Sequence, residues 1–249
     1  MSGTVYLVGA GPGAADLVTL RAARLLESAE IVFHDALVNP EILALAPAAQ
    51  KVPVGKRCGR HSSAQQFINK RLVDAAGKHR IVVRLKGGDP MLFGRAQEEL
   101  DALAAAGIRV EVVPGVTSAL AASADVGTSL TRRGISRSVS FVTPRHGDGE
   151  ASTDWVRAVM AADTAVIYMG SGQAGRIAAS LIEAGKSAGT PITLVENASL
   201  PNSRHSSGSL AHLPQLAALC SGGPALILIG EVYRETASRR AARNERLSA

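Results

Sequence analysis

The chain has 249 residues and a formal net charge of +6, and 46% of its residues are hydrophobic but only 3% are aromatic. Half of the charge lies in residues 234–249, so the rest is too weakly basic and too poor in stacking aromatics for a nucleic-acid partner. No apolar run reaches the length of a membrane-spanning helix, which argues against a membrane partner.

The first half of the chain alternates strand-like and helix-like patterns. Short apolar runs predict strands, apolar residues three apart predict a helix at 17–26, and Gly77 and Gly107 are placed to end helices. This order is typical of a parallel βα series. We expect strands at 5–8, 30–34, 50–54, 81–85 and 109–113, and helices at 17–26, 63–76 and 95–106.

A proline-glycine segment at 114–119 interrupts the alternation and precedes a small-residue helix at 118–125. A second series then begins. We expect strands at 138–142, 164–169, 192–196 and 225–232, helices at 173–184 and 210–219, and a surface loop at 144–154. The fold class is therefore α/β, with domains at 1–114 and 115–233, a cleft between them, and a basic, disordered tail at 234–249.

Cysteine usage and the amino terminus indicate the cytoplasm. Residues 1–6 lack the basic-then-apolar pattern of a secretory signal. Cys58 and Cys220 have no metal-ligand spacing, so we expect free thiols in a reducing compartment and no bound metal.

Two unlike glycine loops predict a split cofactor site. The stretch Arg84–Arg95 places Gly87, Gly88 and Asp89 directly after an apolar strand, where open α/β sheets bind ligands. Alone, it could be an ordinary βα turn. The second loop, Gly9–Gly13, follows the first strand in the same way.

The loop at 9–13 also invites comparison with the dinucleotide fingerprint. Gly9, Gly11 and Ala14 satisfy G-x-G-x-x-[GA], and Asp35 lies where a ribose-binding acid would be. Pro12, however, removes a backbone N–H from the turn that should bind a pyrophosphate. A cofactor without a pyrophosphate fits the loop better.

Several motifs in order carry a resemblance to a known family: VYLVGAGPG at 5–13, HDALV at 34–38, VGKRCGRHSSAQQFIN at 54–69, VVRLKGGDPMLFGR at 82–95, VVPGVTSALAA at 112–122, LTRRG at 130–134, YMG at 168–170 and GPALILIGEV at 223–232. The chain resembles the tetrapyrrole methylases from about residue 4 to residue 233. This resemblance implies two αβα domains that form a homodimer. It also implies methyl transfer from S-adenosylmethionine to C2 and C7 of uroporphyrinogen III, giving precorrin-2 for sirohaem or cobalamin synthesis.

The resemblance also assigns candidate site residues. Cofactor contacts fall on Pro12, Gly87, Gly88, Asp89, Leu92, Thr117, Ser118, Met169, Ala198 and Ala225. For Leu92, Met169 and Ala225, simple core packing is the alternative.

Asp35 is the family-like acid for stabilising charge or accepting a proton, and Lys56 is either a proton donor or an anchor for a substrate carboxylate. From clustering in sequence we expect the carboxylates of the substrate to meet Arg57, Arg60, Arg84, Arg95, Arg132 and Arg133.

Departures from the family pattern leave substrate preference open. Ala96 and Gln97 replace a glycine pair, and Arg132 occupies a usual histidine position. Another tetrapyrrole or RNA methylase is the nearest alternative, followed by a nicotinamide-dependent oxidoreductase and a non-catalytic binding protein. We expect the dehydrogenase and ferrochelatase activities of bifunctional relatives to reside elsewhere.

Overall fold

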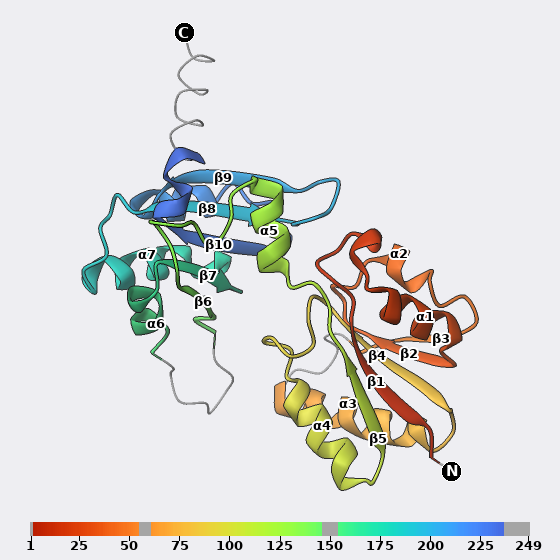
Figure 1. The fold of residues 1–249 in the computed structure, drawn as a ribbon. Helices are drawn as coiled ribbons and strands as arrows, with labels where there is room; N and C mark the ends of the chain where they lie inside the picture. Colours follow the sequence, from red (N-terminus) through yellow and green to blue (C-terminus); the bar gives the residue numbers. More distant parts are fainter. Residues whose placement is uncertain (1, 55–60, 146–153, 237–249) are drawn as a thin grey trace. The chain divides into compact units, whose positions relative to one another are not determined.

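The computed structural model describes residues 2–54, 61–145 and 154–236. The chain divides into two compact units, Met1–Ser118 and Ala119–Ala249 (Figure 1). The division falls four residues after the expected boundary at Pro114. Residues 115–118, which follow the last strand of the first unit, therefore belong to that unit.

The first unit is built on a five-stranded parallel sheet, as the alternation predicted. The strand order is β3-β2-β4-β1-β5, and every neighbouring pair is parallel. The strands are β1 (Thr4–Gly9), β2 (Ile31–His34), β3 (Gln50–Pro53), β4 (Ile81–Lys86) and β5 (Arg109–Val113).

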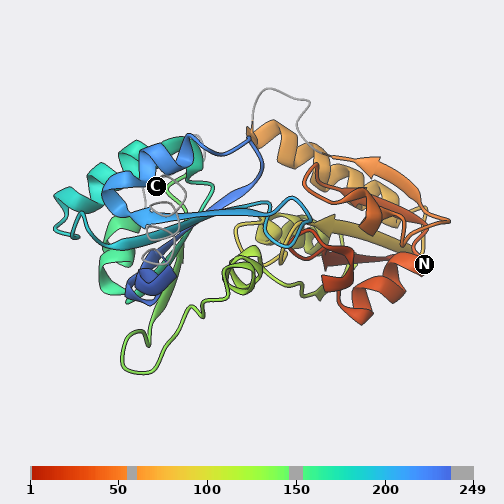
Figure 2. The same ribbon diagram turned by 90° about the horizontal axis from the view of Figure 1, so that it is seen from above.

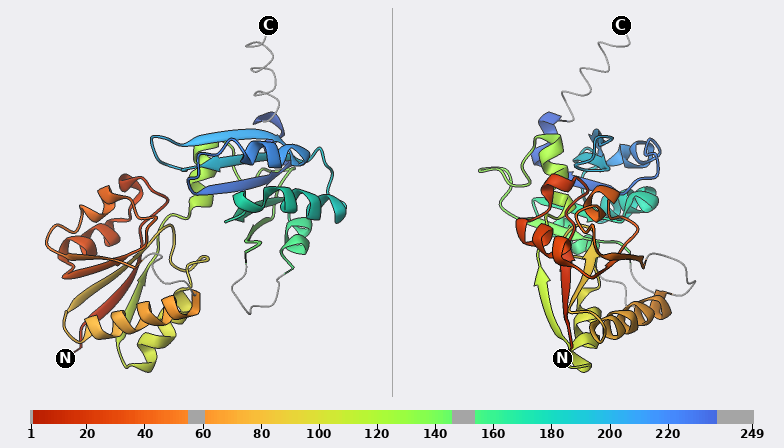
Figure 3. Two further views of the ribbon diagram at one scale, coloured as in Figure 1. Left: turned by 180° about the vertical axis from the view of Figure 1, so that it is seen from behind. Right: turned by 90° about the vertical axis from the view of Figure 1, so that its right-hand side faces the viewer.

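Helices cover both faces of this sheet (Figures 1 and 3). One face packs against α1 (Leu20–Ser28) and α2 (Pro40–Leu43), and the other against α3 (His61–Ala76) and α4 (Ala96–Ala105). Strand alternation divides β4 between the two cores, because Val83 and Leu85 join the α1 side whereas Val82 joins the α3 side. The short helix α2 was not expected, and α1 begins three residues later than predicted, after the N-cap Thr19.

The second unit contains a mixed sheet of order β6-β7-β10-β8-β9, whose strands are labelled in Figure 1 and seen from above in Figure 2. Its strands are β6 (Val139–Val142), β7 (Thr164–Tyr168), β8 (Pro191–Glu196), β9 (Arg204–Ser209) and β10 (Ala225–Gly230). Strand β10 is antiparallel to both of its neighbours, and β9 is antiparallel to β8. The sequence did not predict β9, because its residues RHSSGS form a polar edge strand without an apolar pattern.

This second sheet is also sandwiched. One face buries apolar side chains against α6 (Trp155–Ala161), α7 (Ala174–Glu183) and α8 (Leu213–Ala217). The other face packs against α5 (Ser118–Val126) and the turn η4 (Glu231–Tyr233). Short 3₁₀ turns complete the described elements: η1 (Ala15–Leu17), η2 (Ser171–Gln173) and η3 (Leu210–His212). Each unit is therefore an αβα layer structure, in agreement with the expected fold class.

Candidate active site

Three glycine-containing loops meet at the carboxyl edge of the first sheet, after the adjacent strands β4, β1 and β5. The Gly11 N–H donates to the Gly88 carbonyl at 3.2 Å, and the Gly88 N–H donates to the Gly11 carbonyl at 2.7 Å. A Cβ placed on Gly9 would lie 2.6 Å from the Gly115 nitrogen and 2.7 Å from the Gly88 oxygen. Only glycine permits this approach of main chains, so the loops form one backbone platform.

The backbone N–H groups that would bind a pyrophosphate in the loop after β1 are already used or missing. The Ala10 N–H donates to the Lys86 carbonyl at 2.7 Å, the Gly11 N–H is engaged by Gly88, and Pro12 has none. Three successive positions therefore offer no N–H to a phosphate, which argues against a dinucleotide and suits a cofactor without phosphates.

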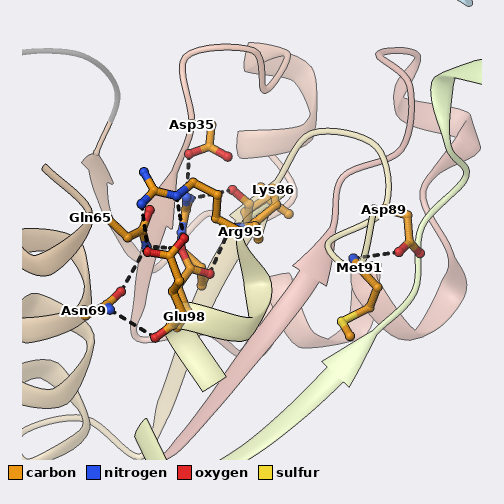
Figure 4. Close-up of polar contacts among 11 residues, drawn as sticks. Asp35, Gln65, Asn69, Lys86, Asp89, Met91, Arg95 and Glu98 are labelled. Atoms are coloured by element: carbon orange, nitrogen blue, oxygen red, sulfur yellow. Dashed lines mark hydrogen bonds and ion pairs between the residues drawn. The ribbon is translucent and has the colours of Figure 1, made fainter. Parts of the chain in front are cut away.

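Asp89 joins two of the loops. Its Oδ1 accepts the Met91 N–H at 2.8 Å (Figure 4), and its Oδ2 accepts the Gly115 N–H at 2.9 Å. Each carboxylate oxygen keeps a second acceptor direction, so the expected contact with a cofactor amine stays compatible with these bonds. The loop is also strained, since Phe93 has φ 53° and Arg95 has φ 55°.

A charged network lies beside this platform (Figure 4). The Arg84 Nη2 donates to Asp35 Oδ1 at 2.6 Å, and its Nε donates to Glu99 Oε1 at 3.0 Å. The Lys86 ammonium donates to the other Glu99 oxygen at 2.9 Å. Arg84, Lys86 and Glu99 are buried, whereas the Asp35 side chain is 33% exposed at the strand end.

Burial and pairing act in opposite directions in this network. Burial disfavours the charge on Arg84, but the Asp35 and Glu99 carboxylates outweigh it and raise the guanidinium pKa above its usual value. For Lys86, burial and the adjacent Arg84 charge lower the pKa despite the Glu99 carboxylate.

In the second unit, three predicted cofactor residues share one sheet edge. Met169 follows β7, Ala198 lies two residues beyond β8, and Ala225 opens the antiparallel β10. Met169 is 44% exposed, so the core alternative is wrong for this side chain. Backbone strain marks this edge as well, because Met169, Asn197 and Ser199 all have φ between 54° and 70°.

Glu196 fixes the loop that leads into β10, a role that the sequence did not reveal. Its buried carboxylate accepts the Ser221 N–H at 3.1 Å, the Ser221 hydroxyl at 3.0 Å and the Gly223 N–H at 2.8 Å. Burial opposes ionisation, but these hydrogen bonds outweigh it and hold the Glu196 pKa below its usual value.

A sequence profile decides the classification. The profile of the tetrapyrrole (corrin/porphyrin) methylases matches residues 4–214. The chain belongs to this family.

Individual tetrapyrrole methylases are similar over most of the chain. A uroporphyrinogen-III C-methyltransferase from Pseudomonas aeruginosa is 44% identical, and the alignment covers 96% of this chain and 98% of that one. A siroheme synthase from Chromobacterium violaceum is 46% identical over 93% of this chain. The chain spans about half the length of such synthases.

A solved structure agrees with the fold. A uroporphyrin-III C-methyltransferase from Thermus thermophilus, in complex with S-adenosylhomocysteine, has a TM-score of 0.81 and 41% identity. The match covers 93% of this chain and 99% of that one.

Other residues singled out by the methylase resemblance lie in several places. Pro12, Gly87, Leu92, Thr117 and Ser118 belong to the loops at the carboxyl edge of the first sheet or to the start of α5. Lys56, Arg57 and Arg60 fall outside the described residues. Among the residues described, no group of histidine, cysteine or acidic side chains could hold a metal ion, and no helix is long and apolar enough to cross a membrane.

The predicted substrate arginines divide by exposure. Arg95 and Arg132 are exposed and form ion pairs with Glu98 at 2.6 Å and Glu235 at 3.0 Å, and Arg133 is exposed too. The prediction for Arg84 does not fit its position, because its side chain is 3% exposed and bonded to Asp35 and Glu99. The sequence did carry a signal for this burial, because Arg84 and Lys86 are two positions apart in an otherwise apolar strand and therefore face the same side of the sheet. A charged side chain that faces a core needs a partner of opposite charge.

Proposed function

We propose that this protein is an S-adenosylmethionine-dependent C-methyltransferase that methylates uroporphyrinogen III at C2 and C7. The product would be precorrin-2, for sirohaem or cobalamin synthesis. The observation that carries the proposal is the near full-length similarity, at 44% identity, to a uroporphyrinogen-III C-methyltransferase. The phosphate-incompatible glycine platform supports the choice of cofactor.

The predicted cofactor residues of each unit have features that suit S-adenosylmethionine. In the first unit, Gly87 is exposed and has no side chain to cover its main chain, and Asp89 can accept a hydrogen bond from an amine through its remaining lone pairs. In the second unit, the exposed Met169 offers a polarizable apolar surface suited to adenine. S-adenosylmethionine supplies an activated methyl group, so the protein needs mainly to align the acceptor carbon.

Asp35 is the acid proposed to act on the acceptor. Attack by a pyrrole carbon develops positive charge on the ring, and a proton must then leave that carbon. A fixed carboxylate at the sheet edge can stabilise the charge and accept the proton. Lys56 is a second candidate, as a proton donor or as an anchor for a carboxylate.

The substrate is a polycarboxylate, and the exposed Arg95, Arg132 and Arg133 are suited to bind it together with Arg57 and Arg60. The proposal also includes a cytoplasmic homodimer without nucleic-acid or membrane partners. Light scattering on the purified chain tests the dimer.

Labelled S-adenosylmethionine and enzymatically made uroporphyrinogen III test the activity. We expect label in the tetrapyrrole fraction, with inhibition by S-adenosylhomocysteine. A parallel reaction with RNA serves as the control for the nearest alternative. Label in RNA alone, or in neither acceptor, would contradict the proposal.

A further inference from the structure

Arg84 occupies an unusual position for a charged side chain. It lies in the central strand β4, and its partners in register are Leu7 on β1 and Phe33 on β2, both members of the apolar core on the α3 and α4 side. Placing a charge there costs free energy unless hydrogen bonds and an opposite charge compensate it.

The compensation comes from Glu99, which is fully buried on the first turn of α4. Its two oxygens accept Arg84 Nε at 3.0 Å, Lys86 Nζ at 2.9 Å and the Gln65 amide at 3.3 Å. Gln65 is held in turn by Asn69, whose own amide donates to the Glu98 carbonyl at 3.0 Å. The carboxylate is therefore fixed by both α3 and β4.

Each nitrogen of the Arg84 guanidinium has one acceptor. Nε is bonded to Glu99, Nη1 donates to the Leu85 carbonyl at 3.2 Å, and Nη2 donates to Asp35 at 2.6 Å. Because the guanidinium is planar and rigid, fixing Nε fixes the direction in which Nη2 points. The two acids and two bases balance in charge, and of these four residues only Asp35 reaches the surface appreciably.

Stability alone does not account for this arrangement. A buried ion pair is often no more stabilising than apolar side chains of the same volume. Removing these charges from water costs free energy, and the network ends at one accessible acid, Asp35. The arrangement is therefore better explained by the position in which it holds the Asp35 carboxylate.

We propose that Glu99 is a positioning residue for the methyl transfer: it orients Arg84, and Arg84 holds the Asp35 carboxylate at the edge of the sheet. The inference rests on the proposed function, in which Asp35 acts on the pyrrole acceptor. Glu99 is fully buried, so the proposal assigns it no contact with substrate or cofactor. Its effect on turnover should therefore pass entirely through Asp35.

A double-mutant cycle tests this dependence. The paired variant Lys86→Met with Glu99→Met removes one positive and one negative charge at nearly constant volume, so the fold should be retained. It leaves Arg84 bonded to Asp35 but without its Nε partner. The single variant Glu99→Gln is the second probe, because an amide has one acceptor oxygen for the two cations that face the carboxylate.

We expect the paired variant to lower kcat about 10- to 100-fold when Asp35 is present, since a small misplacement of a reacting group has effects of this size. In the Asp35→Asn background the same change should alter kcat less than about twofold. Binding of S-adenosylhomocysteine should change less than about twofold in every variant. Glu111→Gln, which breaks an exposed ion pair with Arg109, is the matched control and should leave kcat unchanged.

Equal losses of kcat in both backgrounds would overturn the inference, because they would indicate a general structural effect. An unchanged kcat in the paired variant would overturn it as well. A wild-type protein that methylates no tetrapyrrole would refute the proposed function itself, whereas additive losses with an active wild type would refute only the role of Glu99.

Discussion

The Arg84 guanidinium and the Asp35 carboxylate form an ion pair in which Nη2 lies 2.6 Å from Oδ1. Arg84 is almost completely buried on the α3 side of the first sheet, and Asp35 is one-third exposed at its carboxyl edge. The pair therefore connects the core of the first unit to the surface on which the glycine loops lie.

Replacing Asp35 should separate chemistry from cofactor binding. In Asp35→Asn we expect kcat for tetrapyrrole methylation to fall about 10²- to 10⁴-fold, as for the loss of a general base. The S-adenosylhomocysteine dissociation constant, measured by calorimetry, should stay within about twofold. Asp74→Asn, an exposed change on α3, is the control. Wild-type turnover in Asp35→Asn would remove Asp35 from the mechanism.

Asp89 is predicted to support the cofactor through the loops that it joins. The substitution Asp89→Asn replaces one of the two carboxylate oxygens by an NH₂ group, which cannot accept a hydrogen bond. Either the Met91 N–H or the Gly115 N–H therefore loses its acceptor. We expect a loss of roughly 1–3 kcal/mol in the free energy of unfolding, together with weaker binding of S-adenosylhomocysteine. Denaturant titration and calorimetry measure the two effects. Unchanged affinity would show that the platform does not bind the cofactor.

The glycine platform should not tolerate a side chain. Gly9→Ala would place a methyl group 2.6 Å from the Gly115 nitrogen, so the loops after β1, β4 and β5 would have to separate. We expect a clear fall in the thermal unfolding midpoint and loss of cofactor binding. Gly175→Ala, on α7 with no heavy atom within 4 Å of the added Cβ, is the control and should stabilise by about 0.5–1 kcal/mol. Equal midpoints for the two variants would contradict the close approach of the loops.

Glu196 should contribute stability that depends on pH. Its pKa is lowered in the folded protein, because the hydrogen bonds from Ser221 and Gly223 outweigh burial. The contribution is therefore complete above the ordinary glutamate pKa of about 4.3 and is lost as the pH falls through the lower folded value. In Glu196→Gln the loss of stability should be largest at neutral pH and should shrink in acid. A loss that does not vary with pH would show that ionisation of Glu196 is unimportant.

Two of the three loops of the backbone platform could be predicted from the sequence because their signals are local, whereas the loop with Gly115 was interpreted only as a domain junction. Glycines after apolar strands, and Pro12 in place of an N–H, point to the loops and to the class of cofactor without knowledge of the sheet order. The first βα series was predictable for the same reason, since strands buried on both faces appear as continuous apolar runs.

The charged network could not be predicted in the same way. Arg84 meets Asp35 only because β2 lies beside β4, and it meets Glu99 only because α4 packs on the face that Val82 and Lys86 share. These are tertiary relationships between residues 15 and 49 positions apart in the chain. Strand β9 was missed for a different reason: a polar edge strand is defined by its pairing partner and not by its own pattern.

The most direct test of the proposed function is to locate the transferred carbon. The protein would be incubated with S-adenosylmethionine labelled with ¹³C in its methyl group and with uroporphyrinogen III, and the product analysed by mass spectrometry and NMR. We predict two labelled methyl groups per tetrapyrrole, at C2 and C7. A product with labelled methyl groups at other ring positions, or an unlabelled tetrapyrrole, would contradict the assignment.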